Sequence, residues 1–469
     1  MLTRYIQGRQ VDTMNIFSQT GFLDVSKCAP IQYNILSEYC RDLMSNDRST
    51  QRADEIAWKG EGMRILLATF WLIPHVGGVW KFMEQIQHRL ESMGHEVDLL
   101  GNSPDYKKFH IYNRNRELSK EFIRPFLSAK LSKEYSPLLH RDYNISFYEE
   151  DRYCMELAAA YFGLDQYDVI HTQDIFSARA LGRAKPAHVP LVAHLHGSVA
   201  TEMKNHFRMN PDMGVDEHSI AWKYYDSIEY YGASSGNTII TANEWQRSEL
   251  VEYFGIPDPN IHVFQYGLDT ESFWKRANMG TSIERPANKK VIIFPARLAF
   301  VKGVNVLISA LALLKPVRQD WVCWIVGNGE MRKELELQVA GLALEDDVLF
   351  LGERDDVPAL LTRSDIFVHS CIQDNQPFSV MEAQIAGLPV CVSSAGGLPE
   401  MVKQGVTGFV TPVNDPIALF KQLHLLLEDD EYRIEIGKNA AAWGSTHWSL
   451  DVMIERLLSV YHSVITEGR

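Results

Sequence analysis

Short runs of apolar residues recur along the chain, and most of them end in a glycine-rich or polar turn that leads into a segment with helical spacing. Continuous apolar runs of about four to eight residues are typical of strands buried on both faces of a parallel sheet. In the first half we therefore expect strands at 64–69, 96–100, 168–171, 190–197, 238–241 and 261–264. In the second half we expect strands at 290–295, 321–326, 348–351, 366–369, 388–392 and 408–410.

Helical segments alternate with these strands. We expect helices at 80–93, 243–254, 304–314, 417–427, 431–443 and 449–464. Because 469 residues are too many for one ordinary core, this alternation predicts two α/β domains. Two segments depart from the pattern. The stretch 104–148 is polar and is expected to be irregular, whereas residues 1–62 are expected to form a peripheral extension with one amphipathic helix at 31–44.

One polar loop and the helix after it dominate the second half of the chain. Asp374 lies in the loop, Glu382 follows eight residues later on the helix, and Gly387 ends that helix. The free amides of a helix N-terminus attract anions, whereas carboxylates are suited to accept hydrogen bonds from hydroxyl groups. A diphosphate beside hydroxyl groups indicates a nucleotide-sugar. The alternative is a capped surface helix with two solvated acids.

Two cations lie in the loop between the predicted strand 290–295 and the predicted helix 304–314. Arg297 and Lys302 are five residues apart and can converge on one diphosphate, the arginine as a planar fork and the lysine as a mobile point charge. A solvated basic turn is the alternative. Gly329 lies in another loop of close backbone approach, directly after the strand 321–326.

Polar residues also follow strands in the first half of the chain. Gly77 and Gly78 come after the first strand, but they do not complete a Gly-x-Gly-x-x-Gly fingerprint, so NAD is not predicted and a tight turn explains them equally well. His171, His194 and His196 lie at the ends of two strands. Carboxyl ends of parallel strands are where open α/β sheets bind ligands, although a single histidine is more often structural.

Composition excludes several classes of protein. A formal charge of −14 argues against a nucleic-acid carrier. The six cysteines are scattered without a Cys-x-x-Cys pair, which is typical of a reduced, cytoplasmic protein. No run of about 18 apolar residues predicts a transmembrane helix, and the N-terminus lacks the apolar core of a signal peptide. Peripheral contact with a membrane is still compatible with the sequence.

Other catalytic motifs are absent or out of context. The chain has no Asp-x-Asp triplet, no His-Glu-x-x-His site and no phosphate loop, so we expect no metal ion and no cofactor. The segment 232–236 matches the Gly-x-Ser-x-Gly pattern of serine hydrolases, but it precedes a strand and is interpreted as a turn.

The stretch from Asp374 to Glu382 resembles the acid-x7-acid motif of family 4 retaining glycosyltransferases, which have the GT-B architecture of two Rossmann-like domains with an interdomain cleft. This sequence departs from the family in three places. Asp374 replaces the usual Glu, Ser379 replaces the glycine after the Phe position, and Tyr266 replaces the asparagine of a hinge segment. With Tyr266 we expect any polar role at the hinge to be lost.

The resemblance implies a role for each matching residue. Glu382 would bind the ribose of the donor, Asp374 and His196 would lie near the donor sugar, and Arg297 and Lys302 would bind the diphosphate. Further contacts to the donor would come from Gly77, Gly78, Gly329, Phe378, Ser379 and Val380.

The resemblance also implies the domain limits and the reaction. We expect an extension at 1–62, an acceptor-side domain at 63–270, a nucleotide-sugar domain at 271–446 and a C-terminal helix at 447–469 that crosses back to the first domain. The reaction would be metal-independent transfer from a nucleoside-diphosphate sugar, with UDP or GDP favoured over ADP, to a glycan, lipid or small metabolite. The alternatives are a nucleotide-sugar 2-epimerase of the same fold and an inactive binding module.

Overall fold

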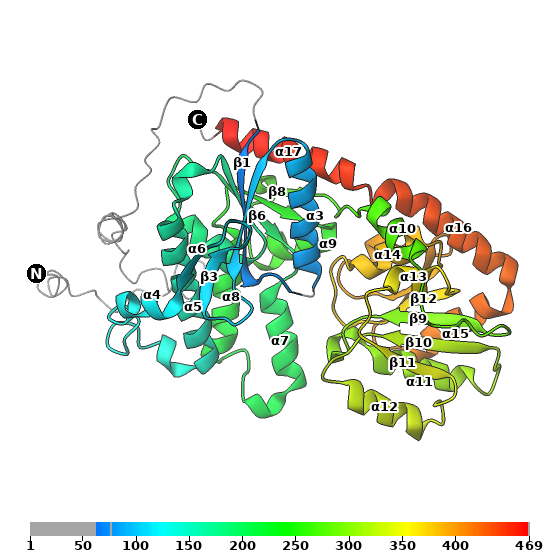
Figure 1. Cartoon of the computed structure of the whole chain (residues 1–469). Helices are drawn as coiled ribbons and strands as arrows, with labels where there is room; N and C mark the ends of the chain where they lie inside the picture. The colour runs from blue at the N-terminus through cyan, green and yellow to red at the C-terminus, as the bar shows by residue number, and fades with distance from the viewer. Residues whose placement is uncertain (1–61, 76, 468–469) are drawn as a thin grey trace, which may run out of the picture.

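The computed structural model describes residues 62–75 and 77–467. Its two β-sheets lie side by side, each with helices on its faces, and the last helix, α17 (Leu450–Glu467), leaves α16 (Asp430–His447) on the second half and lies along the first half (Figure 1). The expected extension, with its helix at 31–44, lies outside the described residues apart from Gly62. Within the described part of the chain, no helix is both long enough and apolar enough to cross a membrane.

The first sheet has eight strands in the order β4-β3-β2-β1-β5-β6-β7-β8. All neighbours pair in parallel except β2 with β3 and β3 with β4. The strands are β1 (Arg64–Leu72), β2 (Glu96–Asn102), β3 (Lys108–Ile111), β4 (Arg116–Ser119), β5 (Val169–Thr172), β6 (Leu191–Leu195), β7 (Thr238–Thr241) and β8 (Ile261–Val263). The helices along this part of the chain are α3 (Gly78–Ser92), α4 (Lys120–Leu127), α5 (Tyr143–Phe162), α6 (Ile175–Ala184), α7 (Val199–Met209), α8 (Ile220–Ala233), α9 (Glu244–Ser248) and α10 (Thr270–Asn278).

The second sheet is wholly parallel, with six strands in the order β11-β10-β9-β12-β13-β14. These are β9 (Lys290–Pro295), β10 (Trp321–Val326), β11 (Val348–Gly352), β12 (Ile366–His369), β13 (Val390–Ser393) and β14 (Gly408–Thr411). The helices after β9 are α11 (Val304–Leu314), α12 (Arg332–Gly341), α13 (Val357–Leu361), α14 (Phe378–Ile385), α15 (Pro416–Glu428), α16 (Asp430–His447) and α17 (Leu450–Glu467). Every strand expected from the apolar runs is present, which confirms the α/β class.

The expectation that 104–148 is irregular is wrong. This stretch contains β3, β4 and α4, and it leads into α5. The later turns of α5 are buried despite their charges because those charges are paired. Arg152 donates to Glu149 at 2.7 Å and to Glu156 at 3.0 Å, and all three side chains are almost wholly buried. A pattern that counts charged residues as exposed cannot predict such a helix.

The expected turn at 232–236 is partly wrong as well, because Gly232 belongs to the last turn of α8. A Cβ atom at Gly232 would lie 2.5 Å from the backbone oxygen of Ile175, so the glycine lets α8 pack closely against the start of α6. The segment does precede β7, as expected. This glycine has a packing role and does not form a nucleophile elbow.

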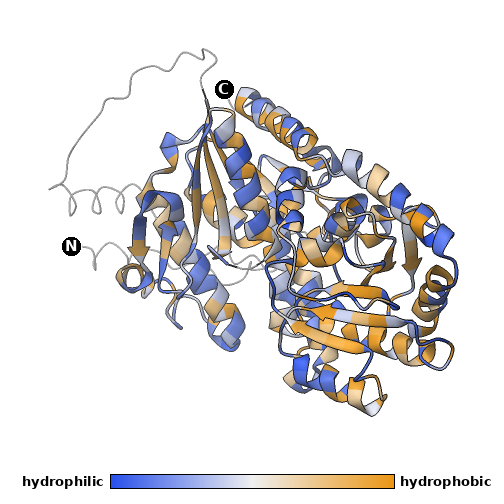
Figure 2. Ribbon diagram, turned by 45° about the vertical axis from the view of Figure 1, so that its right-hand side comes forward, coloured by the Kyte–Doolittle hydropathy of each residue, from blue (hydrophilic) through white to orange (hydrophobic). Residues whose placement is uncertain are grey.

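The C-terminal helix α17 joins the two halves of the molecule (Figure 1). Its Tyr461 lies 2.7 Å from His171 Nδ1 at the end of β5, and Asp451 pairs with Arg89 of α3 at 2.7 Å. One cluster of buried apolar side chains continues from Leu67 of β1, through Leu457 of α17, to residues of the second sheet. The hydropathy colouring shows both sheets as apolar layers between helices of mixed polarity (Figure 2).

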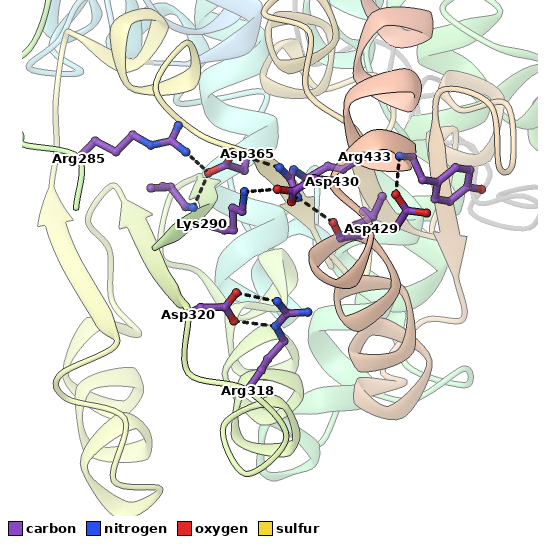
Figure 3. Close-up of polar contacts among 11 residues, drawn as sticks. Arg285, Lys290, Arg318, Asp320, Asp365, Asp429, Asp430 and Arg433 are labelled. Atoms are coloured by element: carbon purple, nitrogen blue, oxygen red, sulfur yellow. Dashed lines mark hydrogen bonds and ion pairs between the residues drawn. The ribbon is translucent and has the colours of Figure 1, made fainter. Parts of the chain in front are cut away.

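Ion pairs fix the first strand of the second sheet to its surroundings (Figure 3). Asp365 accepts hydrogen bonds from the backbone amide of Val291 and from Arg285, each at 2.7 Å. Lys290 pairs with Asp430 of α16 at 2.9 Å. These contacts hold the start of β9, so the loop at its other end, which carries Arg297 and Lys302, extends from a fixed strand.

Candidate active site

Asp374 lies between two basic side chains. Its Oδ2 atom accepts a hydrogen bond from Lys302 Nζ at 2.6 Å and lies 2.7 Å from His369 Nε2. Burial by itself favours the neutral acid, but Lys302 and His369 outweigh it and hold the pKa of Asp374 well below its usual range. The structure therefore places the first acid of the motif in contact with one of the two predicted diphosphate ligands.

Lys302 reaches this position because of a glycine. Gly303 has φ of +66°, and a Cβ atom there would lie 2.0 Å from the backbone oxygen of Ser370. The loop after β9 can thus lie directly against the loop after β12, which brings Lys302 to Asp374. Burial lowers the pKa of Lys302, but Asp374 more than compensates and the pKa is raised, so this lysine is charged.

Arg297 is exposed at the end of β9 and forms no ion pair with any residue in the described ranges. Its loop is held by the loop after β10, because Leu298 N donates to Asn328 O at 2.9 Å. A Cβ atom at Gly329 would lie 2.5 Å from Leu298 O. The predicted Gly329 thus supports the Arg297 loop by close backbone approach.

Glu382 forms an ion pair with a lysine from the other half of the molecule. Lys81 of α3 donates to Glu382 Oε1 at 2.5 Å, and its ammonium lies 5.0 Å from the centre of the Phe378 ring. Gly78, at the start of α3, would place a Cβ atom 3.9 Å from the same ring. The glycine pair and the α14 motif therefore face each other. Sequence reasoning missed Lys81, although a cation one turn into a helix after paired glycines is a usable signal.

His196 has hydrogen bonds at both ring nitrogens. Its Nε2 lies 2.8 Å from Gln173 Oε1, which can only accept, so Nε2 carries the proton and Nδ1 accepts from the Tyr266 hydroxyl at 2.6 Å. Burial lowers the pKa of His196 to about 3, which keeps the ring neutral. The Tyr266 ring stacks on Phe378 with centroids 5.9 Å apart. The expectation that Tyr266 has no polar role is therefore wrong.

The other two histidines lie behind His196 in a stack. The ring centroids of His194 and His196 are 4.6 Å apart, and those of His171 and His194 are 5.4 Å apart. His171 and His194 are fully buried, and burial lowers the pKa of each so that both rings are neutral. His171 contacts Tyr461 of α17, so these two rings connect β5 and β6 to the C-terminal helix.

The residues between the two acids connect the two halves of the molecule. Asn375 Nδ2 donates to the backbone oxygen of His196 at 3.1 Å and to Gln246 Oε1 at 2.8 Å. Gln376 Oε1 accepts from the backbone amide of Tyr266 at 3.1 Å. Nearby, Glu400 accepts from the first amides of α9. Sequence reasoning assigned no role to any of these three side chains.

Glu202, on the first turn of α7, is another residue that sequence reasoning missed. Its side chain is partly open to solvent, but the surrounding protein removes enough water to raise its pKa to about 6 against the opposing effect of Lys302. Asp374 and Arg297 contribute to the same electrostatic environment. An acid from the first half of the molecule thus lies within electrostatic range of the two predicted diphosphate cations.

One cluster in this region has the composition of a metal site. The ligand atoms of His369, Cys371 and Asp374 lie within 4.8 Å of one another. However, Asp374 Oδ2 already contacts Lys302, and burial raises the pKa of the Cys371 thiol, which disfavours the thiolate that a metal would need. The donor set fits a cation poorly while Lys302 stays in place.

Two family descriptions match successive parts of the chain. Residues 76–272 match "Glycosyltransferase Family 4", and residues 276–443 match "Glycosyl transferases group 1". The chain belongs to the family 4 glycosyltransferases. The GT-B architecture follows, with a Rossmann-like domain around each sheet.

Individual relatives of this glycosyltransferase agree with that assignment. An uncharacterized glycosyltransferase of Methanocaldococcus jannaschii is 26% identical over 85% of this chain and 98% of its own length. The UDP-Gal:alpha-D-GlcNAc-diphosphoundecaprenol alpha-1,3-galactosyltransferase of Escherichia coli is 27% identical over 59% of this chain and 70% of its own. Anabaena HepE, whose structure was solved with UDP, has a TM-score of 0.60 at 20% identity and covers 86% of this chain and 100% of its own.

Proposed function

We propose that this glycosyltransferase is a retaining, metal-independent enzyme that uses a nucleoside-diphosphate sugar, with UDP as the nucleotide. The observation that carries the proposal is the position of Lys302, a charged and half-buried lysine whose partner Asp374 lies four residues before α14. The exposed Arg297 lies on the same loop, and Glu382 lies on the second turn of α14. The complex of HepE with UDP supports the choice of nucleotide.

In the proposed complex the diphosphate lies against Arg297, Lys302 and the first amides of α14, and Glu382 accepts hydrogen bonds from the ribose hydroxyls. Negative charge grows on the diphosphate as the bond from the anomeric carbon to the phosphate oxygen breaks, and the two cations stabilise that charge more in the transition state than in the ground state. The acceptor oxygen bonds to the anomeric carbon on the same face. Its proton passes to the departing diphosphate, so no nucleophile from the protein is needed.

Two contacts rearrange in this proposal. The diphosphate competes with Asp374 for Lys302, and the ribose competes with Lys81 for Glu382. Each acid is therefore paired with a cation until the donor takes its place. We also propose a reducing compartment, because Cys154, Cys323, Cys371 and Cys391 are buried free thiols.

The test is to incubate the protein with a panel of UDP- and GDP-sugars and to measure nucleotide release with and without candidate acceptors. A transferase releases nucleotide quickly only when an acceptor is present, and NMR of the product shows whether the anomeric configuration is retained. A 2-epimerase would consume donor without any acceptor, and an inactive binding module would bind nucleotide without turnover. Turnover that saturating EDTA abolishes and magnesium restores would overturn the metal-independent part.

A further inference from the structure

Five large aromatic side chains are exposed at the end of the first domain that lies away from the second domain (Figure 1). They come from α4, from the first turns of α5 and from the segment between these helices, and we call them the aromatic surface. Its members are Phe122 (48% exposed), Phe126 (37%), Tyr135 (55%), Tyr143 (81%) and Phe147 (45%).

The exposed rings are not core side chains that have lost their packing, because each helix buries a different set of residues. Helix α4 buries Ile123 and Leu127, and the ring centroids of Phe122 and Phe126 are 5.6 Å apart outside that buried stripe. On α5 the rings of Tyr143 and Phe147 stack one turn apart, with centroids separated by 6.4 Å. The two helices are joined by an ion pair between Arg124 and Glu150 at 2.7 Å. Each helix therefore presents an aromatic pair to the outside while its other face is packed.

The sequence segment that carries most of this surface is more basic than the rest of the chain, although two of its cations, Lys120 and Arg124, pair with Asp151 and Glu150 of α5. The segment 104–148 carries nine Lys and Arg residues against five Asp and Glu residues, a net charge of +4, whereas the rest of the chain carries −18. Lys133 and Arg141 flank the aromatic residues, are exposed, and form no ion pair with any described residue. Exposed aromatic rings beside unpaired cations match a bilayer surface, where rings enter the headgroup region and cations meet anionic lipids.

We propose that the aromatic surface docks this glycosyltransferase on a lipid bilayer that contains anionic lipids. The inference does not depend on the identity of the donor. It implies, together with the proposed function, that the acceptor is taken from a membrane.

The experiment is co-sedimentation of the full chain with vesicles of phosphatidylcholine alone and of phosphatidylcholine with phosphatidylglycerol. We expect binding to the second kind that weakens with added salt. The double variants Phe122→Ser/Phe126→Ser and Tyr143→Ser/Phe147→Ser should lose most of it. A matched control is Trp274→Ser/Met279→Ser, which removes two exposed apolar side chains elsewhere and should bind like the wild type.

A second pair of variants tests the charges. Lys133→Ala/Arg141→Ala should lower partitioning on the order of 25-fold, about fivefold for each cation, whereas Lys421→Ala/Lys438→Ala on the second domain should have little effect. Unchanged melting temperatures would show that the variants are folded. The proposal is overturned if the wild type binds neither vesicle, if surface and control variants lose binding equally, or if deletion of residues 1–61 abolishes binding while the surface variants retain it. Nucleotide binding measured on the same samples reports separately on the proposed function.

Discussion

The pair between Lys302 and Asp374 offers the sharpest test of how the site is built. Their side chains are 22% and 16% exposed, so the pair is neither on the surface nor fully buried. Removing one partner of a fully buried pair costs about 3–5 kcal/mol, because the remaining charge is left uncompensated. With this partial exposure we expect Asp374→Asn to lower the free energy of unfolding by about 1–3 kcal/mol, a range that lies between those of buried and surface pairs.

The same reasoning predicts strong coupling between the two residues. Lys302→Met should also destabilise, because it leaves the partly buried Asp374 without its lysine, with His369 and the backbone amide of Asn375 as the partners that remain. The double variant removes both charges, so its loss should be smaller than the sum of the single losses by about 1–2 kcal/mol. Chemical denaturation of the wild type, both single variants and the double variant measures this coupling.

Nucleotide affinity separates the roles of the two residues. In Asp374→Asn, Lys302 has lost its competing acid, so affinity for UDP should be unchanged or higher while turnover falls. In Lys302→Met, affinity and turnover should both fall. Calorimetric titration with UDP measures the affinities. Additive stability losses, or an equal loss of UDP affinity in both single variants, would refute the proposed exchange of Asp374 for diphosphate.

Four further predictions follow from other contacts. Glu382→Gln should weaken UDP binding by about 1–3 kcal/mol, the scale of hydrogen bonds to charged groups, whereas Lys81→Met frees Glu382 and should not weaken it; calorimetry compares the two. Arg297→Ala should lower kcat on the order of 10²–10³-fold, more than it raises KM, since it removes one stabiliser of leaving-group charge; steady-state kinetics separates the two constants. Affinity for UDP-glucose should fall as pH rises through about 6, because Glu202 ionises there beside the diphosphate, and Glu202→Gln should flatten this dependence in titrations between pH 5 and 8. Deletion of residues 1–62 should leave turnover intact in a protein that still melts cooperatively.

Each of these has an outcome that contradicts it. Unchanged UDP affinity in Glu382→Gln would remove that acid from the nucleotide site. Wild-type kcat in Arg297→Ala would place the diphosphate elsewhere. An identical pH profile in Glu202→Gln would show that a different group titrates. A folded but inactive deletion variant would show that the extension contributes to the active site.

The sequence predicts strand limits most accurately where a buried strand is also a continuous apolar run. The strands of the second sheet are continuous apolar runs, and three of them, 290–295, 321–326 and 366–369, have the predicted limits. Helix α5 was missed because its polar pattern hides buried ion pairs such as that between Glu149 and Arg152. A single sequence shows which residues are charged but not which of them form ion pairs.

The candidate site shows the same division. Arg297 and Lys302 could be proposed from the sequence because they lie five residues apart in one loop, and Asp374 because it begins the motif that ends at Glu382. For Lys81 the only signal is its place one turn into the helix after the paired glycines, and for Glu202 there is none, because both come from the first domain and reach the site through the packing of the two halves. The expectation for Tyr266 is wrong because its hydroxyl, a polar group at the far end of the ring, contacts His196.

The shared apolar core has a consequence for engineering. The cluster that contains Leu67, Leu457 and Trp324 belongs to neither domain alone, and α17 follows α16 of the second domain but lies along the first. A fragment cut between the sheets would expose part of that cluster to water, so we expect the second domain to be insoluble or unstable when it is produced alone. Chimaeras that exchange nucleotide specificity between family members would need to transfer α17 with the second sheet and to match its partners on α3 and β5. We therefore expect nucleotide specificity to be transferred between family members by exchanging whole chains more readily than by exchanging single domains.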